Sequence, residues 1–403
     1  MSKLEELIQQ YCPDGVEWKT LGEATIMKRG TSATKGIMQE GNIPVISGGR
    51  QPAYYCNISN RTGEVITVAG SGAGAGYVQY WNEPIFVCDA FSIQGNETLK
   101  TKYVYYVLSS IQEKIYSTKK GGGVPHVHIS SIDKFEIPVP PLPVQEEIVR
   151  ILDTFTELQA ELQAELQKRK QQYNYYLDNL LNFKDINRGG YQAEVRWMKM
   201  SEVFETITDY TAAGSFKSIA ENVKYLKSPD YAMLIRTTDL KSRFRKGDFI
   251  YVSKSAFDYL WRGKMDKECI VMPNVGNCGE IYYVHPNSLP YDNCALAPNA
   301  ILVRSKLFNN KYLSYCLQVE CFQKQLAKIT SPVGQSKFNK TELKKLLVPI
   351  PSLADQQKIV DILDRFDTLT TDLTQGLPAE IEKRRQQYEY YRDKLLTFKR
   401  KGA

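Results

Sequence analysis

The chain has 403 residues, more than one hydrophobic core usually organises, so we expect at least two domains. No apolar run reaches the ~20 residues of a membrane span, and the acidic, amphipathic N-terminus has no apolar signal-peptide core, which predicts a cytoplasmic protein. Residues 12–140 hold 12 basic and 11 acidic side chains, whereas residues 190–350 hold 23 and 15, an excess that favours contact with nucleic-acid phosphates.

Two long segments, residues 1–140 and 189–350, predict mixed α+β domains. Short β-rich runs bounded by Gly, Pro and Asn predict their strands. These runs are EVITVA (64–69), YVQYW (77–81), IFVC (85–88), CIVM (269–272) and EIYYV (280–284). Each segment also contains a helical stretch, at 101–116 and 311–328.

The glycine-rich run GSGAGA (70–75) matches the pattern GxGxxG/A of dinucleotide-binding loops. That pattern binds a pyrophosphate only where a helix begins in it. Here residues 76–81 alternate as a strand and Pro84 follows, so we expect a close-packed turn. Eight cysteines without a CxxC pair and only three histidines predict free thiols, no metal site and no cofactor.

The chain contains an internal repeat. Residues 137–158 match residues 348–369 at 11 of 22 positions with an offset of 211. Residues 168–183 match residues 383–398 at 11 of 16 positions with an offset of 215. The second copy has therefore gained four residues between the two blocks.

The repeated segments predict two long helices, because apolar residues recur at helical spacing from Ile148 to Leu180. A helix over 145–181 would be about 55 Å long, too long to bury its apolar stripe against one small domain. We therefore predict an antiparallel coiled coil of the two helices, with a pseudo-two-fold internal repeat. Two independent helical linkers are the alternative. Gly376-Leu377-Pro378 should break the second helix.

The expected domains are a first domain (1–140), a central helix or spacer (141–188), a second domain (189–350) and a C-terminal helix (351–403). The two domains share short landmarks besides the helices. Val16-Glu17-Trp18 in the first domain corresponds to Val195-Arg196-Trp197 in the second. Three further segments correspond in the same order: 43–49 to 233–239, 70–78 to 274–282, and 126–140 to 337–351.

Catalytic motifs are scarce. Pro229-Asp230 followed by Asp239-Leu240-Lys241 resembles the arrangement in which two carboxylates hold Mg²⁺ in nucleases. A stand-alone Mg-dependent DNA endonuclease is therefore the alternative function, although the first half has no counterpart of this motif. No nucleotide-binding GxxxxGK[ST] and no Asn/Asp-Pro-Pro-aromatic segment of amino-methyltransferases is present, so we expect a non-catalytic chain.

The order of domain, PxPPLxxQxxIVxxLDxF, helix, domain, PxPSLxxQxxIVxxLDxF and helix resembles the specificity subunits of type I restriction–modification systems. The matching residues include Pro138, Gln145 and Asp153 in the first copy and Pro349, Gln356 and Asp364 in the second. The resemblance implies two target-recognition domains that read an asymmetric, bipartite site in double-stranded DNA. It also implies helices that bind two adenine-methylating subunits, which recruit ATP-dependent nuclease and translocase subunits.

Candidate contact residues follow from the matched loops and helices. The DNA-binding candidates are Ser47, Arg50, Lys119, Lys120, His126, Arg236, Thr238, Arg243, Arg245 and Lys337. The partner-binding candidates are Tyr173, Tyr176, Leu180, Tyr388, Tyr391 and Leu395. Residues 156–167, TELQ-AELQ-AELQ, suggest a ruler, since one tetrapeptide adds about 6 Å of helical rise. We hypothesise that the tetrapeptide count sets the gap between half-sites.

Overall fold

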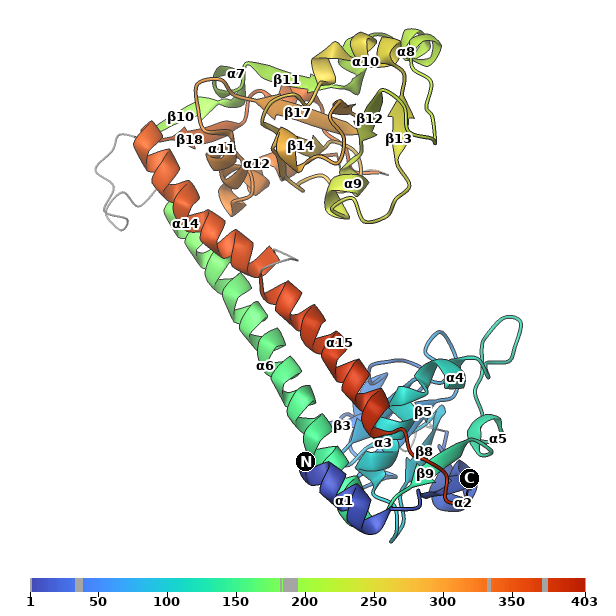
Figure 1. Ribbon diagram of the computed structural model, residues 1–403. Helices are drawn as coiled ribbons and strands as arrows, with labels where there is room; N and C mark the ends of the chain where they lie inside the picture. The colour runs from blue at the N-terminus through green and yellow to red at the C-terminus, as the bar shows by residue number, and fades with distance from the viewer. Residues whose placement is uncertain are drawn as a thin grey trace. The chain divides into compact units, whose positions relative to one another are not determined.

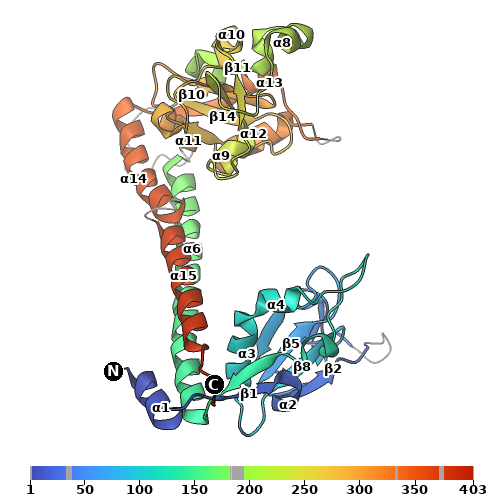
Figure 2. The ribbon, with the colours of Figure 1, turned by 45° about the vertical axis from the view of Figure 1, so that its right-hand side comes forward.

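The computed structural model describes residues 2–32, 39–181, 183, 195–331, 335–371 and 376–402, so residues 182 and 184–188 of the expected spacer lie outside the described part. The chain divides into two compact units. Unit 1 comprises Met1–Glu165 and Leu377–Ala403, and unit 2 comprises Leu166–Gly376. Each unit combines a globular domain, part of one long helix and a second helix alongside it (Figures 1 and 2).

The globular part of unit 1 alternates short strands with helices. Its helices are α1 (Lys3–Tyr11), α2 (Leu21–Ala24), α3 (Thr101–Ser110), α4 (Gln112–Tyr116) and α5 (Ile129–Ile132). Its strands are β1 (Glu17–Thr20), β2 (Ile26–Arg29), β3 (Ile43–Ile46), β4 (Tyr54–Cys56), β5 (Val65–Ala69), β6 (Val78–Trp81), β7 (Phe86–Val87), β8 (Ala90–Gln94) and β9 (Glu136–Val139). The strands and the helical stretch expected in this segment are confirmed.

The globular part of unit 2 is also mixed. Its strands are β10 (Arg196–Lys199), β11 (Thr206–Asp209), β12 (Ala232–Ile235), β13 (Ile250–Val252), β14 (Cys269–Pro273), β15 (Tyr282–Val284), β16 (Cys294–Leu296), β17 (Ala300–Arg304) and β18 (Leu347–Ile350). Its helices are α7 (Met200–Val203), η1 (Tyr210–Ala213), α8 (Phe216–Asn222), α9 (Thr237–Lys241), α10 (Lys254–Tyr259), η2 (Trp261–Gly263), η3 (Pro286–Ser288), α11 (Asn310–Cys316), α12 (Glu320–Ile329) and α13 (Lys340–Leu343).

The sheets show that the repeat includes the globular domains. Unit 1 has a four-stranded sheet β2-β8-β5-β6, a three-stranded sheet β4-β3-β7 and the pair β1-β9. Unit 2 has the corresponding sheets β11-β17-β14-β15 and β13-β12-β16 and the pair β10-β18. In both three-stranded sheets the central strand is antiparallel to one neighbour and parallel to the other. The predicted α+β fold with an internal repeat is confirmed.

The glycine-rich run is a turn, as expected. It joins β5 to the antiparallel strand β6. Gly72 has φ +76°, and a Cβ on Gly74 would lie 2.4 Å from the carbonyl oxygen of Gly48. Only glycine fits such a close backbone approach, and a strand follows the turn, so the turn does not have the helix that a pyrophosphate site requires.

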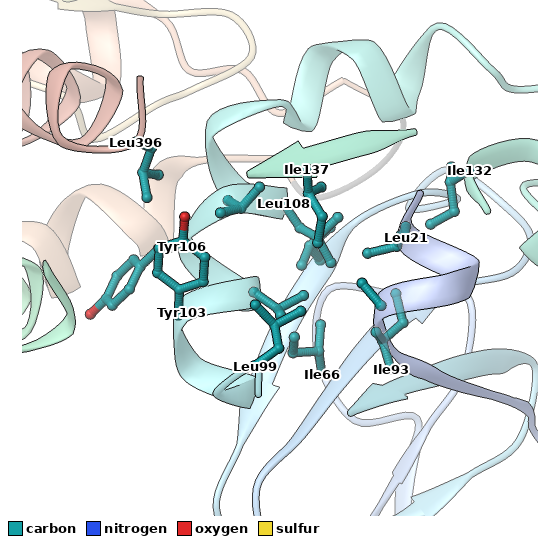
Figure 3. Packing of buried hydrophobic residues seen from close by; sticks show 14 of the residues in the cluster. Leu21, Ile66, Ile93, Leu99, Tyr103, Tyr106, Leu108, Ile132, Ile137 and Leu396 are labelled. Atoms are coloured by element: carbon teal, nitrogen blue, oxygen red, sulfur yellow. The ribbon is translucent and has the colours of Figure 1, made fainter. Parts of the chain in front are cut away.

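The core of unit 1 includes the end of the second repeat. Tyr103 and Leu108 on α3, Ile66 on β5 and Ile93 on β8 belong to one buried cluster, which also includes Leu396 (Figure 3). Beyond it, the backbone N–H of Lys401 donates to the carbonyl oxygen of Val16 (3.0 Å). The C-terminal helix of the second repeat is thus built into the fold of the first domain.

The long helices pair antiparallel within each unit. α6 (Leu142–Leu181) is a single helix of 40 residues. Along its first part lies α15 (Leu377–Leu395), where Phe155 stacks on Tyr391 at 5.5 Å and Gln159 Nε2 donates to the carbonyl oxygen of Arg384 (3.3 Å). Along its last part lies α14 (Leu353–Thr371), with the ring centroids of Tyr176 and Phe366 5.0 Å apart.

The expected break in the second long helix is confirmed, because α14 ends at Thr371 and α15 begins at Leu377. Pro378 takes the second position of α15, where its missing N–H would have no intrahelical partner anyway. None of the eight cysteines forms a disulfide bond. No helix in the described part of the chain is long and apolar enough to cross a membrane.

Candidate nucleic-acid interface

Each globular domain is fixed to its long helix by a buried glutamine. Gln145, with no exposed surface, accepts a hydrogen bond from the backbone N–H of Lys100 (2.9 Å) and donates to the carbonyl oxygen of Pro140 (2.7 Å). Gln356 in unit 2 does the same with Asn309 (3.0 Å) and Pro351 (3.0 Å). The glutamine of the repeated motif therefore satisfies backbone groups that burial would otherwise leave without partners.

A tyrosine and a lysine also connect each domain to its long helix. The hydroxyl of Tyr106 donates to Asp153 Oδ1, and Lys102 Nζ lies 2.8 Å from the same carboxylate. In unit 2, Tyr315 donates to Asp364, and Lys311 Nζ lies 3.5 Å from it. Burial, and then the hydrogen bond to the carboxylate, raises the pKa of both tyrosines, so both stay protonated donors.

Three loops meet in the first domain and hold the DNA-binding candidates expected there. The loop after β3 packs against the glycine turn, where Gly48 approaches Gly74. The turn joins the loop before α5, because the N–H of Gly72 donates to Pro125 O (3.0 Å) and that of Val127 to Gly70 O (3.0 Å). Ser47, Arg50, Lys120 and His126 lie on these loops, and Lys119 lies next to Lys120. The structure thus gathers these five candidates around one turn.

The second domain repeats this arrangement. The N–H of Gly276 donates to Ser336 O (2.8 Å), and the N–H of Phe338 donates to Asn274 O (3.1 Å). These bonds correspond to those of Gly72 and Val127. Lys241 on α9 forms an ion pair with Glu280 and so connects the loop after β12 to the same turn. We call these two sets of loops the loop clusters of the first and second domain.

Aromatic rings support several of the basic candidates in the first domain. The guanidinium of Arg50 lies 5.0 Å from the ring centroid of Tyr77, and Lys119 Nζ lies 4.1 Å from that of Tyr116. The rings of His126 and His128 stack at 5.9 Å. Cation–π contacts of this kind orient a side chain while its charge remains able to attract a phosphate.

Arg236 is placed differently from the other candidates in the second domain. Its guanidinium donates to Asp239 Oδ1 (2.7 Å) and Oδ2 (3.0 Å), and also to the carbonyl oxygen of Asp248. The hydrogen bond to Asp239 raises the pKa of Arg236. Arg236 therefore shapes the loop, whereas Thr238, Arg243, Arg245 and Lys337 have exposed side chains.

The loop that Arg236 holds by hydrogen bonds has an unusual backbone conformation. Arg243 (φ 49°) and Phe244 (φ 60°) are consecutive non-glycine residues in the left-handed region. Phe244 packs against Phe249, and its N–H donates to Asp239 O (2.9 Å). Such strain persists only where surrounding contacts hold it, and it concentrates at functional sites.

The carboxylates of the nuclease alternative are not arranged to hold a cation. Asp239 is only 2% exposed and is neutralised by Arg236. In the described residues, no group of three or more His, Cys, Asp or Glu side chains could hold a metal ion. The short motif around Asp230 and Asp239 is thus part of a folded loop.

The partner-binding candidates lie mostly inside the units. Tyr173, Tyr176 and Leu180 pack against the core of unit 2, and Tyr388 and Leu395 pack against that of unit 1. Burial raises the pKa of Tyr388 to about 12.

Two exposed tyrosines of the long helices were not among the sequence candidates: Tyr175 and Tyr390, which are 65% and 62% exposed. They are equivalent, because their numbers differ by the repeat offset of 215. Their position just outside the apolar stripe of the helix was the signal that could have found them.

Comparison with known proteins identifies the family. A family model described as the type I restriction modification DNA specificity domain matches residues 13–169 and 193–383. A type I restriction enzyme specificity subunit of Escherichia coli is 29% identical over 440 residues, which cover 99% of this chain and 97% of that protein. A putative type I restriction enzyme specificity subunit of Haemophilus influenzae is 29% identical and covers 95% and 96%.

A crystal structure of a type I restriction-modification S subunit from M. genitalium has the same fold, with a TM-score of 0.56 at 19% identity over 94% of this chain and 95% of that one. None of these comparisons supports the nuclease alternative. The family match covers both repeats and most of the chain. The chain therefore belongs to the DNA specificity subunits of type I restriction–modification systems, which recognise the DNA sequence and are not themselves the catalytic subunits.

Proposed function

We propose that residues 1–140 and 189–350 are two target-recognition domains that each read one half of an asymmetric, interrupted site in double-stranded DNA. The observation that carries this proposal is the repeated loop cluster, with different side chains at equivalent places. His126 in the first domain corresponds to Lys337 in the second, at the repeat offset of 211. The two domains share a backbone framework but present different side chains at equivalent positions. Because side chains read the bases, the two half-sites should differ in sequence.

Within the loop clusters, phosphate contacts and base contacts have different requirements. Lys119, Lys120 and Arg245 carry charges suited to phosphates, which fix the position of a protein on DNA. Lys337 can donate either to a phosphate or to the edge of a guanine. Arg50 and Arg243 have the bidentate geometry that guanine recognition uses. Ser47, Thr238 and His126 add further hydrogen-bonding groups. Arg236 acts in this proposal by shaping the loop that presents Arg243.

We further propose that the helices in residues 141–188 and 351–403 bind two methyltransferase subunits in the cytoplasm, and that these recruit the nuclease and translocase subunits. Tyr175 and Tyr390 are exposed on this surface, and Tyr391 is 37% exposed. Tyr173, Tyr176, Leu180, Tyr388, Tyr391 and Leu395 support it from beneath or beside.

Exchange of one recognition domain tests this function. A chimera in which residues 196–350 are replaced by the corresponding domain of a relative is expressed with the methyltransferase subunits, and methylated adenines are mapped in the host genome. One half of the bipartite motif should change while the other half remains. Changes in both halves, or in neither, would contradict the assignment of one half-site to each domain.

A further inference from the structure

Asp89 lies in the first domain where the chain passes from the three-stranded sheet to the four-stranded sheet, between β7 and β8. Its carbonyl oxygen accepts from the N–H of Gly70 (3.0 Å) at the glycine turn. The N–H of Cys88, the residue before it, donates to the carbonyl oxygen of Ile46 (2.8 Å), which precedes the loop after β3. A pocket of about 180 Å³ is lined by both Asp89 and His126. Asp89 therefore lies where the three loops of the first loop cluster meet.

The carboxylate of Asp89 is held at one oxygen and open at the other. The Ser71 hydroxyl donates to Asp89 Oδ2. Oδ1 lies 3.2 Å from the position that a Cβ on residue 70 would take, and because residue 70 is glycine, no side chain covers this oxygen. The Asp89 side chain is exposed, and within the described part of the chain it forms no ion pair. One carboxylate oxygen is thus oriented and available to an outside donor.

The loops around Asp89 carry no acid of their own. Residues 47–53, 70–77 and 117–128 contain one arginine and two lysines but neither aspartate nor glutamate. A carboxylate placed among these cations reduces their attraction for phosphates. Such a group is favourable at a DNA surface only where it faces a hydrogen-bond donor instead of a phosphate.

The second domain shows that the shared framework does not require an acid at this place. Asn299 precedes β17 as Asp89 precedes β8, and its carbonyl oxygen accepts from the N–H of Asn274 (3.1 Å). Asn299 has φ +66°, a left-handed conformation that asparagine adopts more readily than most residues. Asp89 has no positive φ. Backbone conformation therefore accounts for Asn299 and leaves the acid at position 89 without a structural reason.

The bases differ in what they offer a carboxylate in the major groove. Cytosine presents its N4 amino group, which only donates. Adenine presents an amino donor beside the N7 acceptor, whereas guanine presents two acceptors and thymine presents one acceptor and a methyl group. An acceptor brought against a carboxylate is repelled, so an open carboxylate oxygen selects cytosine. An amide, which both donates and accepts, suits adenine.

We propose that Asp89 is a specificity-determining residue of the first domain and that its Oδ1 accepts a hydrogen bond from the N4 amino group of a cytosine. Ser71 fixes the carboxylate through the other oxygen. This inference rests on the proposed function of the first domain as a reader of one half-site. It adds the base at one position of that half-site and the atom that reads it.

The unsubstituted complex gives the first test. The half-site of the first domain is the half of the methylated motif that exchange of residues 196–350 leaves unchanged. It should contain a position at which a C·G pair is required. Replacing that pair by A·T should weaken binding to the chain assembled with its methylating partners by about tenfold or more. Fluorescence anisotropy measures this ratio of affinities for the cytosine and adenine probes.

Asp89→Asn keeps the shape of the side chain and an oxygen for the Ser71 hydroxyl, but it removes the charge and adds a donor. At one position of the first half-site it should lose or reverse the preference for cytosine over adenine, while all other positions keep theirs. Asp89→Glu retains the charge and should still prefer cytosine. Glu97→Gln, which removes a charge from an exposed residue beyond the other end of β8, should preserve every preference.

A cytosine preference that Asp89→Asn leaves unchanged overturns the inference, because a purely structural role through Ser71 predicts that result. A first half-site without a required C·G pair also overturns it, and this outcome needs no variant to fold. A melting curve checks that each variant is folded. Absence of sequence-specific binding by the unsubstituted complex overturns the proposed function as well.

Discussion

His126 and Lys337 occupy the same position in the two domains. The N–H of His126 donates to Lys120 O (2.8 Å), and the carbonyl oxygen of Lys337 accepts from Ser331 N–H (2.9 Å), within equivalent backbone bridges 211 residues apart. Each residue also bridges the adjoining turn, at Ser71 and Val275 respectively. The backbone framework is therefore shared, and the side chain is what differs.

Exchange of these side chains should alter one half-site at a time. Lys337→His should weaken binding by about 10-fold or more, in the range of one lost base or phosphate contact, and leave the preference at the other half-site intact. Methylation mapping and binding at several salt concentrations would measure this. An equal loss of sequence preference at both half-sites would contradict the proposal that each domain reads its half-site independently.

The buried glutamine should be important for the stability of its unit. Gln145→Ala leaves Lys100 N–H and Pro140 O without their partners, which should lower the free energy of unfolding by about 1–3 kcal/mol. Thermal or urea unfolding measures the change. Gln163→Ala, on the exposed surface of the same helix, is the control and should be near neutral. Equal effects of both substitutions would contradict a stabilising role of Gln145 at the contact between the domain and its long helix.

Acid should weaken the attachment of α1 to α6. The hydrogen bond from Arg150, together with that from Lys3, lowers the pKa of Glu147 to about 2 from 4.5. A lowered folded-state pKa adds stability that is present above pH 4.5 and is lost as the pH falls towards 2. Glu147→Gln should be less stable at pH 7 and should show a smaller loss over that window. A parallel pH dependence of both proteins would count against this role.

Tyr175 and Tyr390 should each contribute to binding of one methyltransferase subunit. Either Tyr→Ser substitution should reduce the number of bound methyltransferase subunits from two towards one, because each tyrosine belongs to one copy of the repeat. Native mass spectrometry or light scattering counts them. The exposed Glu161→Gln on α6 serves as a control. Retention of both subunits by the double tyrosine variant would exclude these residues as anchors.

The tetrapeptide ruler can be tested on α6, which continues without interruption through residues 156–167. Deletion of Ala160–Gln163 removes about 6 Å of rise and leaves the helix face turned by about 40°. The gap in the methylated motif should shorten by one or two base pairs, with both half-site sequences unchanged. Replacing the same four residues with four alanines keeps the length and should keep the gap. An unchanged gap after the deletion would show that α6 is not the ruler.

The sequence alone determined the repeat and the antiparallel pairing of its helices. Local physical rules suffice for these features: helical periodicity fixes the buried stripe, and Pro378 fixes a helix start. Gln145 and Asp153 stood out because they recur in the second copy as Gln356 and Asp364. The turn at residues 70–75 was also predictable, since a strand pattern follows the glycines.

Tertiary structure alone decided which side chains are available. Periodicity placed Tyr176 on the apolar stripe and Tyr175 outside it, but only the structure shows that Phe366 packs on Tyr176 while Tyr175 stays 65% exposed. Nor could sequence show that Arg236 is bound to Asp239 and Asp248. The pocket beside Asp89 joins residues 29–30, 70 and 88–91, segments whose proximity arises only when the strands pair into one sheet.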